Sequence, residues 1–69
     1  MNSVNVDGKP VCYGVNKLVL KNGKVFADGV EVGTYKKESK IHVSGNIGKI
    51  DSDSMLDVKV DGMVFDFSM

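Results

Sequence analysis

The sequence contains no arginine and no tryptophan, and its 69 residues include one cysteine and one histidine. Because Cys12 is alone, no disulfide can form within one chain, and one cysteine with His42 cannot supply a zinc site. Arginine is the preferred residue for bidentate contacts with phosphates and base edges, so its absence disfavours dedicated nucleic-acid binding. A free thiol and four methionines favour a reducing, cytosolic setting.

Long apolar runs are also missing. The first residues carry neither a basic start nor an apolar stretch, so we expect no signal peptide, and no segment approaches the roughly 20 apolar residues of a membrane span. Hydrophobic residues make up 42% of the chain, which favours one small folded domain over residues 1–69. With five aromatic residues and no staple, a lone core would be thin, so we expect association into a homo-oligomer.

Residues 18–32 contain two tight reversals, Asn22-Gly23 and Asp28-Gly29. These dipeptides most readily place two successive residues at positive φ, which a two-residue hairpin of type I′ requires. Aliphatic and β-branched residues flank both turns. The segment is therefore predicted to be a three-stranded meander.

The pattern apolar-x-apolar-Asp-Gly-x-x-apolar occurs three times, at residues 4–11, 25–32 and 58–65. Turn chemistry alone explains so short a pattern, so we interpret it as three hairpins rather than as a duplication. In the first hairpin Pro10 lacks an amide hydrogen and should lie at a sheet edge or a bulge.

The third copy gives the sharpest prediction of register. If Asp61-Gly62 closes a two-residue hairpin, one face is wholly apolar and Asp57 lies opposite Asp66, a mildly unfavourable like-charge pair. The predicted apolar pairs are Val60 with Met63, Val58 with Phe65, and Leu56 with Phe67.

Between these hairpins, residues 41–43 form a strand pattern, and Gly45 and Gly48 interrupt the apolar residues that follow. Such short runs are typical of a bulged strand or of β-solenoid corners. No useful stretch has helical periodicity. The predicted fold class is all-β: a small hairpin or meander sheet, or a short β-solenoid or β-prism, intertwined in a homo-oligomer.

No segment of the sequence satisfies a known catalytic or metal-binding motif. Residues 45–50 resemble a phosphate loop, but the glycine spacing is wrong and Ile50 follows the lysine where Ser or Thr is required. Residues 51–54 begin like a calcium loop but lack its glycine and distal glutamate. A lone His42 in a strand and a Cys12 expected to be buried supply no evident nucleophile and base. We therefore predict no catalytic residues, no metal, no cofactor and no enzymatic activity.

The candidate site is the one polar, basic stretch, residues 33–40, together with the strand that follows it. An aromatic face, hydroxyls and ammonium groups close together can hold a phosphorylated or otherwise anionic ligand by stacking and charge-assisted hydrogen bonds. The alternative is a solvated loop that keeps the protein soluble. The predicted ligand-binding residues are Tyr35, Lys36, Lys37, Ser39, Lys40 and His42.

The formal charge is zero but unevenly placed. Residues 1–40 hold seven lysines and four acidic residues, whereas residues 41–69 hold two lysines and five aspartates. The positive half could meet an anionic ligand or the negative half of a neighbouring subunit.

Residues 22–50 resemble a group of small bacteriophage proteins that carry an N-G-x-V-x-x-D-G-x-x-V segment followed by short I-x-V-x-G runs. The matching segments are 22–32 and 41–50. The resemblance implies short β-solenoids or β-prisms, often oligomeric, in the cytosol of an infected host cell. This chain has one such glycine-containing run where those proteins have many.

The resemblance favours a protein that acts by stoichiometric binding. The most concrete hypothesis is sequestration of a small phosphorylated ligand, such as a cyclic nucleotide immune signal. One alternative is a structural module of a virion or tail. Another is a direct protein inhibitor of a host defence enzyme, which would bind a host protein through an exposed edge strand.

Overall fold

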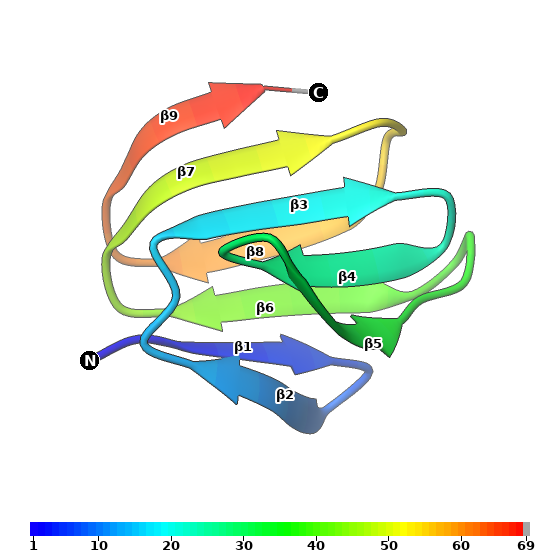
Figure 1. The fold of residues 1–69 in the computed structure, drawn as a ribbon, viewed down its shortest axis with the longest axis horizontal. Helices are drawn as coiled ribbons and strands as arrows, with labels where there is room; N and C mark the ends of the chain where they lie inside the picture. Colours follow the sequence, from blue (N-terminus) through cyan, green and yellow to red (C-terminus); the bar gives the residue numbers. More distant parts are fainter. Residues whose placement is uncertain (69) are drawn as a thin grey trace.

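The computed structural model describes residues 1–68 and contains nine strands arranged as two facing sheets (Figure 1). One sheet has the order β2-β1-β6-β8 and the other the order β5-β4-β3-β7-β9. No helix long and apolar enough to cross a lipid bilayer occurs among the described residues. The strands are β1 (Ser3–Val6), β2 (Lys9–Tyr13), β3 (Lys17–Lys21), β4 (Lys24–Ala27), β5 (Val30–Thr34), β6 (Lys40–Ser44), β7 (Ile47–Ser52), β8 (Asp57–Asp61) and β9 (Val64–Ser68).

The all-β prediction is confirmed, and so are the first three turns. Asp7-Gly8, Asn22-Gly23 and Asp28-Gly29 each place both residues at positive φ, as at Asn22 (53°) and Gly23 (77°). They join β1 to β2, β3 to β4, and β4 to β5 as antiparallel pairs. Pro10 lies on the edge strand β2, where the register of its pairing with β1 shifts, as its missing amide hydrogen requires.

The fourth predicted hairpin is wrong. Asp61 and Gly62 have no positive φ, and β8 and β9 belong to different sheets, so neither the three apolar pairs predicted across that turn nor the opposition of Asp57 and Asp66 exists. The backbone of this segment instead bonds to the preceding corner. The Ile47 amide donates to the carbonyl of Met63 at 2.9 Å, and the Met63 amide donates to the Asn46 side chain at 2.9 Å. The chain therefore crosses between the sheets here.

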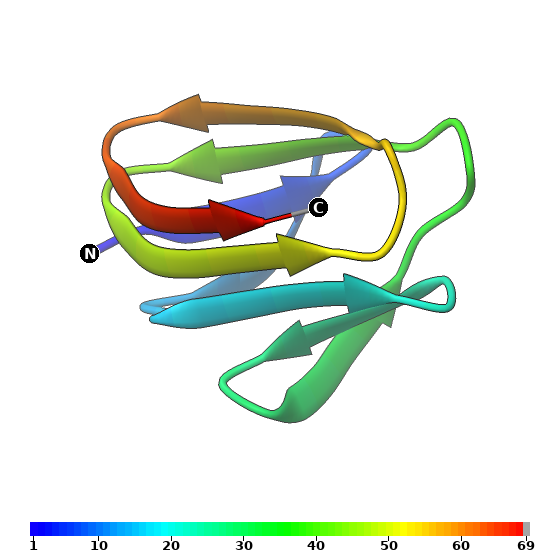
Figure 2. The ribbon, with the colours of Figure 1, turned by 90° about the horizontal axis from the view of Figure 1, so that it is seen from above.

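Strands β6 to β9 wind as a coil of two turns, which can be followed in Figure 2. β8 lies parallel to β6 in one sheet and β9 lies parallel to β7 in the other. Paired residues are always 17 positions apart, as for Ile41 with Val58 and Ile47 with Val64. Because antiparallel hairpins make up the rest of both sheets, the described residues form neither a β-solenoid nor a β-prism, and that part of the prediction is wrong.

The core lies between the two sheets and draws on both. Alternate residues of the central strands face inward, which gives the buried–exposed alternation of β1, β3 and β6. Half-buried apolar residues from the outer strands pack around this group. The buried apolar residues are Val4, Val6, Val15, Leu18, Leu20, Val25, Ile41, Val43, Ile47 and Ile50.

Asn2 joins three segments at one end of the core, although it precedes the first strand. Its side-chain amide donates to the carbonyls of Val15 at 2.6 Å and Asn46 at 2.8 Å, and its oxygen accepts from the Val15 amide at 2.9 Å. The residue is 7% exposed. A buried polar side chain with all these groups paired fixes β1, the link from β2 to β3, and the β6–β7 corner relative to one another.

Candidate functional site

The basic stretch forms a loop over residues 35–39, between β5 and β6, and hydrogen bonds fix it at both ends. The Tyr35 amide donates to the carbonyl of Gly23 at 2.9 Å, which attaches the loop to the β3–β4 turn. At the other end, the Ser39 hydroxyl donates to the Asp7 carboxylate at 2.8 Å and accepts from the Lys36 amide at 2.8 Å. Ser39 is 3% exposed. Both ends of the loop are therefore attached to the rest of the fold, while Lys36, Lys37 and Glu38 between them are exposed.

Asp7 is the residue that connects the loop to the first hairpin. Its second carboxylate oxygen accepts from the Lys40 amide at 2.9 Å, and its own amide donates to the carbonyl of Lys40 at 2.9 Å. The hydrogen bond from the Lys40 amide, and then that from Ser39, holds the pKa of Asp7 below its ordinary value of 3.8. The carboxylate is thus ionised at neutral pH.

This arrangement predicts that Asp7→Asn loses stability at neutral pH but not in acid. A lowered pKa stabilises the folded state above the unfolded pKa of about 4, and that contribution is lost as the pH falls through the folded pKa below it. We expect the urea midpoint of Asp7→Asn to lie below that of the wild type at pH 7 and the two to converge at about pH 2 to 3. Glu38→Gln, on the same loop and exposed, is the control and should follow the wild type at both pH values. A gap of equal size at both pH values would contradict the prediction.

A cleft of about 420 Å³ opens where the edge strands of the two sheets diverge, beside this loop. Lys9 and Val11 of β2 form one wall, Thr34 of β5 forms the other, and the loop closes one side. The lining residues therefore include apolar side chains, hydroxyls, one ionised carboxylate and two exposed lysines, of which Lys36 lies near enough to Asp7 to lower its pKa. The lining residues are Val6, Asp7, Lys9, Val11, Thr34, Tyr35, Lys36 and Ser39.

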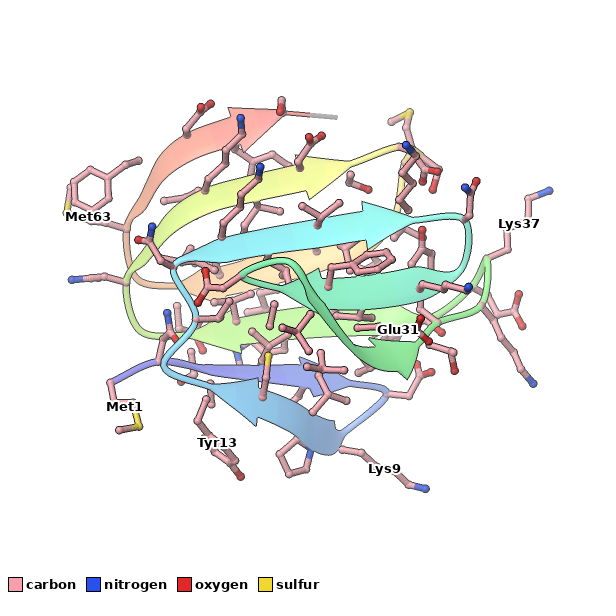
Figure 3. All side chains as sticks on the ribbon, in the orientation of Figure 1. Met1, Lys9, Tyr13, Glu31, Lys37 and Met63 are labelled. Carbon is pink, nitrogen blue, oxygen red and sulfur yellow. The ribbon has the colours of Figure 1, made fainter. Side chains whose placement is uncertain are left out.

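The six predicted site residues divide between three places. Tyr35, Lys36 and Ser39 line the cleft. Lys37 is instead one of the residues around a separate, smaller hollow of about 290 Å³, with Asn22, on the other side of Tyr35. Figure 3 shows Lys37 pointing away from the molecule at the tip of the loop, far from Lys9.

Lys40 and His42 belong to β6 rather than to the cleft. Lys40 contributes its backbone to the hydrogen bonds with Asp7 and begins the strand. His42 lies on the outer face of its sheet, between Asn5 and Lys59, and its Nε2 is 2.6 Å from the carboxylate of Asp61. A histidine–carboxylate pair orients an imidazole, but no nucleophile contacts His42 among the hydrogen bonds of the described residues.

Tyr35 separates the two hollows and is half-buried. Its hydroxyl donates to the Asp53 carboxylate at 3.2 Å. Burial, followed by the nearby charge of Asp53, raises the pKa of Tyr35 above its ordinary value of 10. The phenol is therefore neutral at physiological pH. Its ring forms an apolar wall, and its hydroxyl is held by the hydrogen bond to Asp53.

Lys9 and Thr34 line the cleft but are not among the predicted site residues. Thr34 lies within the basic stretch 33–40, directly before Tyr35, whereas Lys9 comes from the first hairpin. Lys9 joins the loop because β2 and β5 form adjacent edges of the two sheets. The signal that could have found Lys9 is its neighbour Pro10, which marks β2 as an edge strand.

Neither Cys12 nor the acidic residues of the described part of the chain indicate a second site. Cys12 is half-buried on β2, and burial, followed by the charge of Asp28, raises the pKa of its thiol, so the unreactive protonated form predominates at pH 7. Within residues 1–68 no group of three or more histidine, cysteine, aspartate or glutamate side chains is placed to hold a metal ion.

No protein-family model, curated protein or solved structure matches this chain.

Proposed function

We propose that this chain is a non-enzymatic binding module that holds a small phosphorylated ligand in the cleft between β2 and β5. The observation that carries the proposal is the presence of two lysines, Lys9 and Lys36, among the residues that line a cleft with both apolar and polar walls. The cleft volume falls within the range of ligand pockets, about 300 to 1,000 Å³. Two lysines and one aspartate among the lining residues give the cleft a formal charge of +1, which suits an anion.

The most concrete ligand is a cyclic nucleotide immune signal, and the setting is a phage protein that sequesters this signal in the host cytosol. The apolar contributions of Val11 and Tyr35 suit the face of a base, while the lysines suit the phosphates.

The experiment is a thermal shift titration with cyclic dinucleotides and with inorganic phosphate. A ligand at 100 times its Kd stabilises the folded state by about 2.7 kcal/mol. In a domain of this size each kcal/mol raises Tm by about 4–8 °C. We expect the wild type to show such a rise with a cyclic dinucleotide, and Lys36→Glu and Lys9→Glu to lose it.

Lys37→Glu is the matched control, because it changes the same charge on the same loop outside the cleft. It should keep the wild-type rise in Tm. The proposal fails if millimolar cyclic dinucleotide leaves the wild-type Tm unchanged, or if Lys37→Glu loses as much as Lys36→Glu. A rise with phosphate alone, of the same size, would reduce the ligand class to simple anions.

The alternative of a direct protein inhibitor requires a free strand edge for β-augmentation. β2 and β5 are poor edges, since β2 carries Pro10 and both strands have register shifts in their pairing. The edges that fit are β8 and β9, at the opposite side of both sheets.

A further inference from the structure

Both sheets end at the last turn of the coil, where β8 and β9 form adjacent edges. The inward-facing residues of β8 and β9 pair with fully buried residues of β6 and β7, which form the preceding turn of the coil. Ile41 and Ile50 are at most 1% exposed, whereas Val58 above the first is half-buried and Phe67 above the second is 40% exposed. Among residues 1–68, the last turn thus presents core-facing side chains that no further strand covers.

Four of the seven large exposed apolar residues in the described part of the chain, Met55, Met63, Phe65 and Phe67, belong to the segment that forms this last turn. Met63 is 60% exposed and Phe65 is 72% exposed, and both belong to the corner and strand that close the second turn. Apolar surface that adjoins unpaired strand edges favours association with another chain.

The backbone of β8 has free groups at defined positions. The carbonyl of Asp61 accepts from the Gly45 amide at 3.4 Å and so points toward the turn below. Backbone groups alternate in direction along a strand, so those of Val58 and Val60 point toward the open edge. A second strand can therefore pair with β8 through these two residues.

The charges on β8 select one pairing with a second copy of the same strand. In an antiparallel pair centred on Val58, Asp57 lies opposite Lys59 of the second copy, and Lys59 lies opposite its Asp57. The same pairing brings the side chain of Leu56, which directly precedes β8 and whose amide donates to the carbonyl of Ser54, beside that of Val60, so apolar residues meet.

The neighbouring registers fit less well. A pair centred on Lys59 sets that lysine against itself and Asp57 against Asp61, which are like charges. A pair centred on Val60 requires Gly62, which is packed against the backbone of Gly45, to pair with Val58.

We propose that two copies of this chain join end to end through β8 and β9, related by a twofold axis that runs across both sheets through the β8 pair at Val58. Such an axis pairs β8 with β8 and β9 with β9, so it continues both sheets at once and covers the inward residues of the last turn. A single extended peptide could extend only one of the two sheets. The contact is isologous and closed, which ends the assembly at a dimer.

The test is sedimentation equilibrium, with native mass spectrometry, of the wild type and of charge variants. We expect a wild-type mass of twice 7.5 kDa at micromolar concentration. Lys59→Asp and Asp57→Lys each create two like-charge pairs across the axis and should raise the dimer Kd by about thirtyfold. The double variant Asp57→Lys/Lys59→Asp restores both pairs and should return the Kd to near the wild-type value.

Lys21→Asp, which makes the same charge change on the interior strand β3, is the matched control and should dimerise like the wild type. Amide hydrogen exchange gives a second reading, since the amides of Val58 and Val60 should exchange more slowly as wild-type concentration rises and show no such change in Lys59→Asp.

A wild type that stays at 7.5 kDa at 100 µM would overturn the proposal, even if a host protein then bound this edge. So would a dimer that Lys59→Asp leaves intact, or a ladder of larger oligomers. The cleft lies at the other edge of both sheets, so Lys59→Asp should leave the thermal shift with cyclic dinucleotide unchanged. The two proposals can therefore fail separately.

Discussion

Asn2→Asp should lower the free energy of unfolding at pH 7 by about 3–5 kcal/mol, which is much of the stability of so small a domain. The side-chain amide of Asn2 donates to the carbonyls of Val15 and Asn46. In the variant a carboxylate oxygen would face those carbonyl oxygens, leaving two buried acceptors without donors. The measurement is urea denaturation followed by circular dichroism.

The pH dependence distinguishes this mechanism from simple loss of packing. Burial beside carbonyl oxygens raises the folded pKa of the carboxyl introduced at position 2 above its unfolded value of about 3.9. Stability associated with a raised pKa is present below the unfolded pKa and is lost as the pH rises through the folded value. The stability gap to the wild type should therefore narrow at pH 4.

The control is Asn5→Asp, the same change on β1 at a half-buried position of the outer face beside His42. It should alter stability by no more than about 0.5 kcal/mol, in the range of ordinary surface substitutions. If Asn5→Asp cost as much as Asn2→Asp, the contacts of Asn2 would not be the cause.

The second large effect is expected from Gly62→Ala. A Cβ at this position would overlap the carbonyl oxygen of Gly45 and lie 2.5 Å from its carbonyl carbon. Both obstructing atoms are backbone, so neither can rotate away as a side chain would. The corner must open, which separates β8 and β9 from the turn below, and we expect a loss of about 3 kcal/mol in unfolding free energy.

Gly8→Ala separates this effect from backbone conformation. Gly8 lies at a φ of 82°, and no atom lies within 4 Å of the place that a Cβ would occupy, so only conformational strain opposes the change. That strain costs about 1–2 kcal/mol. We expect Gly62→Ala to lose more stability than Gly8→Ala, and to lose amide protection first in β8 and β9. Equal losses would mean that the close contact at Gly45 relaxes without cost.

The sequence predicts the hairpins well because their information is local. Asp7-Gly8, Asn22-Gly23 and Asp28-Gly29 need only two residues at positive φ, and flanking apolar residues supply the strands. Asp61-Gly62 is also an Asp-Gly dipeptide, but its conformation depends on packing against the backbone of Gly45. That contact cannot be predicted from the dipeptide itself. The 17-residue spacing of the two glycines, repeated in the apolar residues around them, was the available sign of a coil.

The site is predictable only in part for a related reason. Tyr35, Lys36 and Ser39 are adjacent in a polar, basic loop, so composition alone indicates them. Lys9 reaches the same cleft through the arrangement of two sheet edges, and no local pattern encodes that arrangement. Asn2 is a third case, because a single asparagine before the first strand gives no sign of the three backbone groups that it will meet.

The central positions of β6 and β7 have a consequence for how the chain folds. β6 pairs with β1 on one side and β8 on the other, and β7 does the same between β3 and β9. The three N-terminal turns can form within microseconds from neighbouring residues. Neither sheet is complete until β6 and β7 insert, and each must close a loop of about 30 residues or more to reach its N-terminal partner. We therefore expect the hairpin units to form first and the pairing of β6 with β1 and of β7 with β3 to limit the rate of folding.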